Sequence, residues 1–221
     1  SGVASGNVRS IAISGSDVYV GGGFTQAGGI SANHIARWDE NTNTWTALGS
    51  GVNNTVNSVT ICGSDVYVGG AFTSAGGSSN RRYLAKWNTN TNLWSQVGST
   101  NPNDPVSSIA LTGSNLYVVG QFTQIGGIAY ANYIGCWNIN TDNWSILGQG
   151  VSTAITTLLA SGFNVYAGGQ FSQAGGISAN KIACWNSDDE AWSTLGSGFS
   201  NTVNAIAVSG FHVYAGGLFN D

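Results

Sequence analysis

Short apolar runs separated by polar turns follow one another along the whole chain. In the first repeat of this pattern, the runs cover residues 8–14, 18–24, 34–38 and 44–48. Val, Ile, Thr, Tyr and Trp dominate the runs, and no window shows a 3.6-residue apolar period long enough for a helix. Gly, Asn, Asp and Ser cluster between the runs, as they do in turns that join strands. The pattern therefore predicts four β-strands in each repeat, with the polar, glycine-rich residues 25–33 as a loop.

The second run returns with small changes along the chain. It reads Val-Tyr-Val-Gly-Gly-Gly-Phe at residues 18–24, and it recurs at 66–72, 116–122, 165–171 and 213–219. The closing Phe recurs at spacings of 48, 50, 49 and 48 residues. Repeats of about 40–50 residues with four antiparallel strands are typical of propeller blades, in which small sheets pack face to face around an axis. Both faces of each sheet are then covered, which explains why the strands are apolar without strict alternation.

The repeat predicts an all-β propeller that forms a single domain over residues 1–221. Complete four-stranded antiparallel blades are expected at residues 8–55, 56–105, 106–154 and 155–202. Residues 203–221 supply only the first two strands of another blade, so we expect four complete blades and a partial fifth. Two arrangements stay open at this point: a five-bladed ring, or part of a larger or multi-chain propeller.

Eight tryptophans form four pairs whose members are seven residues apart, on either side of the turn after the third run. The pairs are Trp38 and Trp45, Trp87 and Trp94, Trp137 and Trp144, and Trp185 and Trp192. Indole rings bury large areas and fill wide gaps between packed layers. We therefore expect each pair to lie across a hairpin in the outer part of a blade, as packing residues.

The repeat resembles a known family. The succession "SGSDVYVGGGF" at residues 14–24, followed by "IARWDENTNTWTALG" at 35–49, resembles the kelch repeat, with its Tyr and double Gly at the end of the second strand. The variant with "FTQAGG" and "LGSG" is similar to the kelch-related repeats of large extracellular or cell-surface proteins, including the Rax2-type cortical polarity proteins. The resemblance implies a propeller whose first strand is innermost, and an extracellular or cell-surface location. Because the matching residues are structural, it implies a fold and no particular ligand.

Charge narrows the range of partners. Charged residues make up only 7% of the chain, the formal net charge is −4, and six Lys plus Arg are scattered along it. The chain therefore has no basic stripe that could follow a phosphate backbone or an anionic lipid surface, and we expect no nucleic acid partner. No apolar run approaches 18 residues, so we expect no membrane insertion.

The three cysteines do not form a recognisable framework. Cys62 occupies the repeat position of Ser14, while Cys136 and Cys184 share the position before the first Trp of a pair. Equivalent positions in neighbouring repeats lie about one repeat width apart, beyond the ~7 Å Cα separation that a disulfide allows. We expect three free, small, buried side chains. No Cys or His spacing indicates zinc, and we expect no cofactor.

Two motifs have both a ligand interpretation and a structural one. The segment Gly21-Gly22-Gly23 lacks the Lys-Ser/Thr of a phosphate loop, so we interpret its glycines as permitting a bulge and close contact between blades. The turns between the third and fourth runs carry oxygen ligands at alternate positions, faintly like a calcium loop. Residues 88–92 contain no carboxylate, and turns in which Asn or Asp bonds its own backbone explain the pattern. Only Asp188-Asp189-Glu190 keeps calcium open as an alternative.

Catalysis has no support in the sequence. His34 and His212 occupy different repeat positions, no Ser or Cys nucleophile motif accompanies them, and the ten acidic residues form no recurring pair. General acid–base chemistry needs such positioned groups. We predict no catalytic residues and no enzymatic activity.

The loops that follow the second and fourth strands are expected on the same face of the propeller, because strand direction alternates. Amides and tyrosines there are candidate binding residues for sugar hydroxyls or a peptide. They are Gln26, Asn33, Asn53, Asn54, Asn80, Tyr83, Gln124, Tyr130, Asn132, Gln173 and Asn180. The repeated Asn also has a structural interpretation, in which its amide bonds loop backbone.

The sequence therefore predicts a non-catalytic, lectin-like binding scaffold outside the cell or at its surface, which recognises a protein or glycan through this loop face. The alternative is a structural repeat protein that self-assembles into an oligomer or filament through its incomplete last blade. An unpaired strand edge at residues 213–219 would recruit a partner strand.

Overall fold

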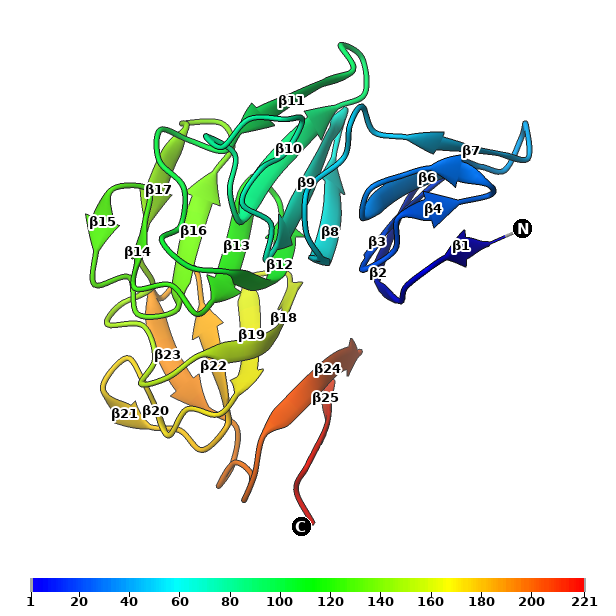
Figure 1. Ribbon diagram of the computed structural model, residues 1–221. Coiled ribbons are helices and arrows are strands. Elements are labelled where there is room, and N and C mark those ends of the chain that lie inside the picture. The colour runs from blue at the N-terminus through cyan, green and yellow to red at the C-terminus, as the bar shows by residue number, and fades with distance from the viewer. Residues whose placement is uncertain (1, 221) are drawn as a thin grey trace. The chain divides into compact units, whose positions relative to one another are not determined.

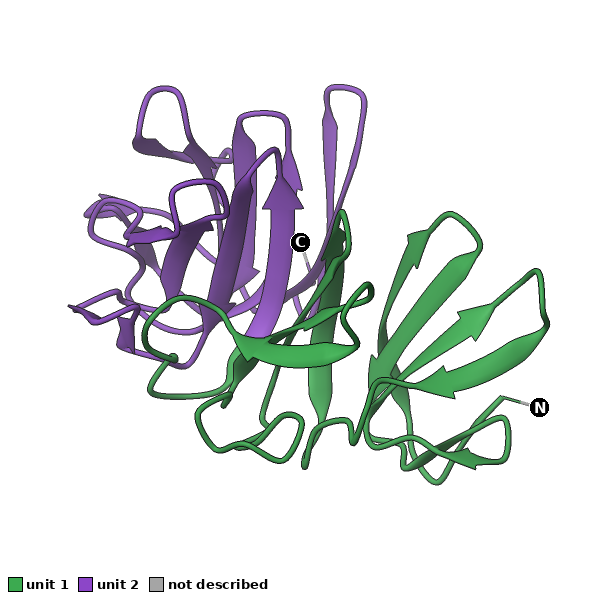
Figure 2. Ribbon diagram, turned by 90° about the horizontal axis from the view of Figure 1, so that it is seen from above, with its two compact units in different colours: residues 1–106 green, residues 107–221 purple. Residues whose placement is uncertain are grey.

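The computed structural model describes residues 2–220, and every regular element among them is a β-strand (Figure 1). The chain divides into two compact units, residues 1–106 and 107–221 (Figure 2). The prediction of one domain over residues 1–221 remains a prediction.

Unit 1 contains two four-stranded antiparallel sheets. Blade 1 consists of β2 (Val8–Ser14), β3 (Asp17–Gly22), β6 (Ile35–Asp39) and β7 (Thr44–Ala47). Blade 2 consists of β8 (Val56–Cys62), β9 (Asp65–Gly70), β10 (Leu84–Asn88) and β11 (Leu93–Gln96). In both blades the strands are paired in sequence order, so each blade is a simple meander.

Unit 2 repeats this arrangement, and its first strand starts at the boundary between the units. Blade 3 consists of β12 (Val106–Thr112), β13 (Asn115–Gly120), β16 (Ile134–Asn138) and β17 (Asn143–Ser145). Blade 4 consists of β18 (Ile155–Ser161), β19 (Asn164–Gly169), β22 (Ile182–Asn186) and β23 (Ala191–Thr194). A two-stranded sheet of β24 (Val203–Ser209) and β25 (His212–Gly217) follows. The predicted all-β propeller with four complete blades and a partial fifth is confirmed.

The glycines that end the second strand have a geometric cause. The first strand carries a β-bulge opposite them, between Val8 and Ser10 in blade 1, and the same irregularity recurs in blades 2 and 4 and in the sheet of β24 and β25. A Cβ atom on Gly168 would lie 2.7 Å from a methyl group of Val203 and 3.0 Å from one of Ile206 in the following blade. These glycines therefore permit the bulge and the close contact between neighbouring blades, as predicted.

The tryptophan pairs pack across the outer hairpins. Trp38 pairs directly with Trp45 in the register of β6 and β7, with ring centroids 5.3 Å apart, and the other three pairs lie at 5.5, 5.3 and 5.6 Å. The buried indoles of Trp94 and Trp192 donate hydrogen bonds of 2.8 and 2.9 Å to Leu48 O and Leu147 O of the preceding blade. The predicted packing role is confirmed, and each of these two indoles also links two blades.

The predicted loop over residues 25–33 contains regular structure that the sequence did not reveal. It folds into the small hairpin of β4 (Gln26–Ala27) and β5 (Ile30–Ser31), and β1 (Val3–Ala4) adds a third strand to it. Unit 2 has the same hairpins, β14 (Gln124–Ile125) with β15 (Ile128–Ala129) and β20 (Gln173–Ala174) with β21 (Ile177–Ser178). Two-residue strands carry too little periodicity for a sequence pattern to detect.

All three cysteines are free, as predicted, although Cys62 is only half-buried. Among residues 2–220, no helix is long and apolar enough to cross a bilayer.

Candidate functional site

The loop face is built from the small hairpins and the segments that follow the fourth strands. In unit 1, Val52 pairs with Ala75, which itself forms an isolated bridge with Ser78, so the segment after blade 1 lies beside this turn of blade 2. In unit 2, Val151 pairs with Ala174 in the same way. Within each unit, the two kinds of loop therefore lie on one face, as the alternation of strand direction predicts.

The repeated Asn side chains tie these loops together. Asn33, Asn132 and Asn180 each donate from Nδ2 to a backbone carbonyl 17 residues later, at 3.1, 2.9 and 3.0 Å. In blade 2 the direction is reversed, because Asn101 Nδ2 donates to the carbonyl of Asn80 at 3.0 Å. The structural interpretation of the repeated Asn is confirmed for these loops.

The Asn53 side chain also connects two loops, one from blade 1 and one from blade 2. Its Oδ1 accepts hydrogen bonds from the backbone N–H groups of Thr73 and Ser74 at 2.9 and 3.0 Å, and its Nδ2 donates to Thr73 Oγ1 at 2.9 Å. Ser152 takes the same place in unit 2, where its Oγ accepts from the N–H groups of Ser172 and Gln173. The neighbouring Asn54 caps its own turn through Thr55 N at 2.7 Å.

Asn53→Ala is expected to lower the free energy of unfolding by about 1–2 kcal/mol, because two backbone donors lose their acceptor while solvent partly replaces it. Asn53→Ser should recover most of that loss, since Ser152 accepts the same pair of bonds in unit 2. Urea unfolding of both variants measures the difference. Equal losses in Ala and Ser would contradict the assigned bonds.

Four residues on the loop face adopt a left-handed backbone immediately before the third strand, a position that we call the left-handed slot. They are His34, Tyr83, Tyr133 and Lys181, with φ of 66, 64, 73 and 67°. The backbone of each is held at both ends. In blade 1, His34 N donates to Phe24 O at 2.9 Å and His34 O accepts from Gly22 N at 3.0 Å, and equivalent bonds occur in the other three blades. Left-handed conformations suit Gly and Asn, and larger side chains there are strained.

A cleft of about 350 Å³ opens beside this slot in unit 1. Its lining includes Asn33, His34, Ser50, Asn53 and Ser74. Burial lowers the pKa of His34 below its ordinary value, and the backbone hydrogen bond with Gly22 opposes this shift only in part. At neutral pH the described lining is therefore uncharged and carries amide, hydroxyl and imidazole groups, with His34 Nδ1 buried and lacking a partner among the residues described.

The other predicted site residues are distributed along the loop face. Gln26, Gln124 and Gln173 are exposed at the first positions of β4, β14 and β20, and Tyr130 is 81% exposed. Of the eleven predicted residues, only Asn33 and Asn53 line the cleft in unit 1. His34 does so too, but the prediction did not include it, because its role becomes visible only when the slot is compared across blades. Tyr83 occupies the same slot in blade 2.

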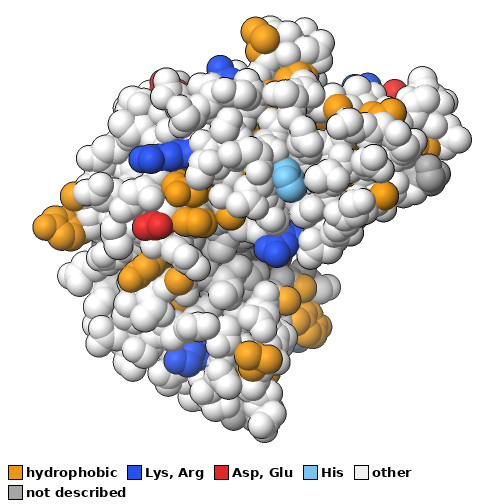
Figure 3. All heavy atoms as spheres, viewed as in Figure 1, with side chains coloured by type: hydrophobic (Ala, Val, Ile, Leu, Met, Phe, Trp, Pro, Cys, Tyr) orange, Lys and Arg blue, Asp and Glu red, His pale blue; other side chains and the backbone are white. Residues whose placement is uncertain are grey.

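The turns between third and fourth strands bond their own backbone. Asn186 Oδ1 accepts from Asp188 N and Asp189 N at 2.9 and 3.0 Å, and Asp39, Asn88 and Asn138 make the same pair of bonds. Over the part of the chain that the structure describes, no three His, Cys, Asp or Glu side chains are grouped to hold a metal ion. Charged side chains are scattered singly over the face that Figure 3 shows.

The blades and their polar loop face define a β-propeller, a fold that provides a scaffold for binding in general. Residues 2–115 match the family described as the Rax2 C-terminal beta propeller domain, and the chain belongs to this family. No curated protein matches the sequence.

Solved structures with low identity share the fold. The computationally designed Ika4 protein is 16% identical, with a TM-score of 0.52 over 81% of this chain and 91% of that one. The designed Ika8 protein is 14% identical, with a TM-score of 0.61 over 94% and 67% of the two chains. A chain of the mitotic checkpoint complex is 13% identical, with a TM-score of 0.63 over 95% of this chain and 56% of that one. These similarities support the fold alone.

Proposed function

We propose that this chain is a non-catalytic binding scaffold that recognises a glycan, or a protein through its glycans, on the loop face. The left-handed slot carries the proposal. Each residue in the slot has a left-handed backbone, and this conformation costs a residue other than Gly about 1–3 kcal/mol. Three of the four are aromatic or imidazole rings, His34, Tyr83 and Tyr133. Strain of this kind is retained where a side chain serves recognition.

The chemistry of the neighbouring cleft favours a neutral, hydroxyl-rich ligand. Its amides and hydroxyls exchange hydrogen bonds with sugar hydroxyls, and its described lining carries no charge that would select an acidic or basic peptide. The amides of Asn33 and Asn53 are held by backbone partners, so they present a fixed arrangement. We place the protein outside the cell or at its surface, in keeping with the repeats that its own sequence resembles.

A glycan array is the direct test, first with the unaltered chain and then with His34→Gly and Tyr83→Gly combined. We expect neutral glycans to bind the unaltered chain and the signal to fall about tenfold or more in the double variant, since a few central contacts dominate binding. Asn92→Gly is the matched control, because Asn92 is also left-handed, with a φ of 54°, but lies in a turn between third and fourth strands. A blank array with folded protein, or full binding by the double variant, would contradict the proposal.

Self-assembly is a second candidate, favoured by two incomplete surfaces. Ile11 and Ile13 on β2 are 59% and 68% exposed, whereas Val59 at the position of Ile11 in blade 2 is 6% exposed. In unit 2, β25 pairs with β24 alone among the described strands. A Cβ atom on Gly216 would meet nothing within 4 Å, whereas one on the equivalent Gly168 meets the next blade. A second copy that placed its first strand on this surface would form a head-to-tail contact.

Light scattering over a concentration series separates the two candidates. Discrete oligomers or fibres that dissociate in Ile11→Lys would support self-assembly. A monomer at all concentrations would exclude self-assembly and leave the glycan proposal intact.

A further inference from the structure

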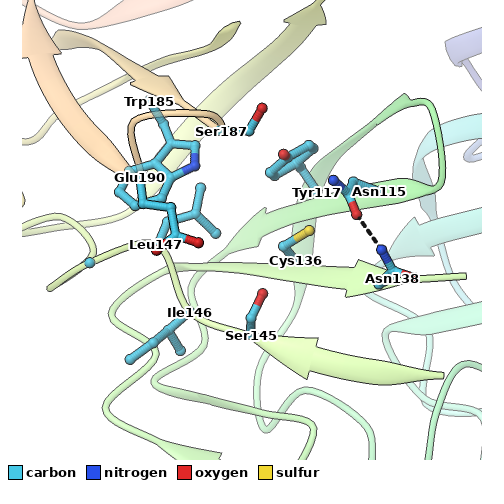
Figure 4. Close-up of a pocket in the computed structure, with 11 residues that line it drawn as sticks. Asn115, Tyr117, Cys136, Asn138, Ser145, Ile146, Leu147, Trp185, Ser187 and Glu190 are labelled. Carbon is cyan, nitrogen blue, oxygen red and sulfur yellow. Dashed lines mark hydrogen bonds between the residues drawn. The ribbon is translucent and has the colours of Figure 1, made fainter. Parts of the chain in front are cut away.

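A cleft of unit 2 lies between blades 3 and 4, at the opposite end of the strands from the loop face. It has a volume of about 420 Å³, within the range of ligand sites. Its lining includes Tyr117, Cys136, Ser145, Trp185, Ser187 and Glu190. Tyr117, Cys136 and Ser145 turn their polar atoms toward the central space (Figure 4). Ser187 Oγ donates to Phe163 O at 3.1 Å and keeps its acceptor capacity.

Blades 1 and 2 have a cleft at the same repeat positions, but its volume is only about 60 Å³. Its lining includes Tyr19, Trp87 and Thr89, which have the repeat positions of Tyr117, Trp185 and Ser187. The two clefts differ most at two positions. Arg37 occupies the place of Cys136, and Asn92 occupies the place of Glu190. The cleft in unit 2 is therefore open because the short side chain of Cys136 stands where blade 1 has the long side chain of Arg37.

In both blades of unit 1, a basic side chain lies beside the tyrosine of the second strand. Arg37 Nη1 lies 3.5 Å from Asp17 Oδ2, in contact with the cleft wall that includes Tyr19. In blade 2, Lys86 Nζ lies 2.8 Å from Asp65 Oδ2 and 5.9 Å from the centroid of the Tyr67 ring. Aromatic rings and carboxylates together stabilise a positive charge in such a position.

Blade 3 has lost both members of this ion pair. Cys136 replaces the cation, and Asn115 replaces the aspartate and accepts a hydrogen bond from Asn138 Nδ2 at 2.8 Å. A carboxylate reappears on the facing wall as Glu190, which has a φ of 50°. The equivalent left-handed turn positions hold Asn43, Asn92 and Asp142, which tolerate this backbone better than Glu does.

Glu190 provides the negative charge of the described lining. Burial, and then the neighbouring Cys136, raise the pKa of Tyr117 to about 12. Burial raises the pKa of Cys136 to about 11, so both groups are neutral at physiological pH. The cleft thus combines a tyrosine, hydroxyls and one carboxylate around the volume that an arginine side chain fills in unit 1.

We propose that this cleft binds an arginine or lysine side chain of a partner protein, in the place where blade 1 holds its own Arg37. The inserted cation would lie beside Tyr117, with Glu190 as its counter-charge and the hydroxyls of Ser145 and Ser187 as acceptors. The site is separate from the loop face, and this inference does not depend on glycan binding.

The test is an NMR titration with N-acetyl-arginine amide, monitored at the Trp185 indole and the Glu190 amide. We expect saturable shifts at millimolar concentration. The citrulline analogue, which has nearly the same shape and no charge, should bind about tenfold more weakly, as for the loss of one charge-assisted hydrogen bond. Glu190→Gln should weaken arginine binding by a similar factor, and as an exposed turn substitution it leaves the core intact.

Cys136→Arg should abolish binding of the probe, because it refills the cleft as Arg37 does in blade 1. Cys184→Arg is the matched control, since it adds the same charge at the same repeat position of blade 4, outside the lining. Equal binding of arginine and citrulline, unchanged binding by Glu190→Gln, or no saturable shift at Trp185 would overturn the proposal.

Discussion

Gly76→Ala is expected to destabilise the protein by about 3 kcal/mol, among the largest effects of any single methyl group in this fold. Gly76 has a φ of 56°, and an added Cβ would lie 2.8 Å from Cδ1 and 2.9 Å from Cβ of Trp94. The left-handed backbone costs Ala about 1–2 kcal/mol, and displacing a packed ring adds about 1–3 kcal/mol. Trp94 is 6% exposed and its indole N–H is bonded to Leu48 O, so it has little freedom to move.

Gly77→Ala is the matched control. Gly77 has a φ of 77°, but an added Cβ would meet nothing within 4 Å. We expect a loss of about 1–2 kcal/mol from backbone strain alone. Chemical denaturation of the two variants separates strain from collision, and equal losses would show that the ring does not set the requirement for Gly76.

Trp94→Ala is expected to lower the free energy of unfolding by about 3–5 kcal/mol, because it opens a cavity beside Trp87 and removes the indole hydrogen bond to Leu48 O. Leu48 O keeps its second donor, Gly51 N, at 3.0 Å, so most of the loss comes from the cavity. Trp94→Phe should cost less, since a ring remains in the gap while the hydrogen bond to blade 1 is lost. Leu93→Ala, one residue away and 66% exposed, should change stability by less than about 0.5 kcal/mol. A loss below about 1 kcal/mol in Trp94→Ala, measured by urea unfolding, would contradict the packing role.

The blades could be predicted from the sequence because each depends on signals within one repeat. The Trp38 and Trp45 pair marks a hairpin by its spacing, and the Asn-rich turn between them bonds its own backbone. The hairpin of β4 and β5 could not be predicted, because its strands have two residues each and gain a partner from β1, more than 20 residues away.

The candidate sites depended on comparisons that only the structure allows. The left-handed slot has no consensus residue, since it holds His34, Tyr83, Tyr133 and Lys181, and its signal is a shared φ. The cleft between blades 3 and 4 is open because Cys136 is smaller than Arg37, which has the same position in blade 1, and its carboxylate comes from Glu190 on blade 4. The exposed glutamines of the loop face could be predicted from the sequence, but their absence from the lining of the unit 1 cleft beside His34 could not.

We infer that the slot residues serve binding rather than the fold. The stability of His34→Gly, measured by urea unfolding against the unaltered chain, separates these two roles. Because glycine relieves the left-handed strain, we expect the free energy of unfolding to rise or to stay within about 1 kcal/mol. A loss of about 2 kcal/mol or more would show instead that the imidazole is a packing element of the fold.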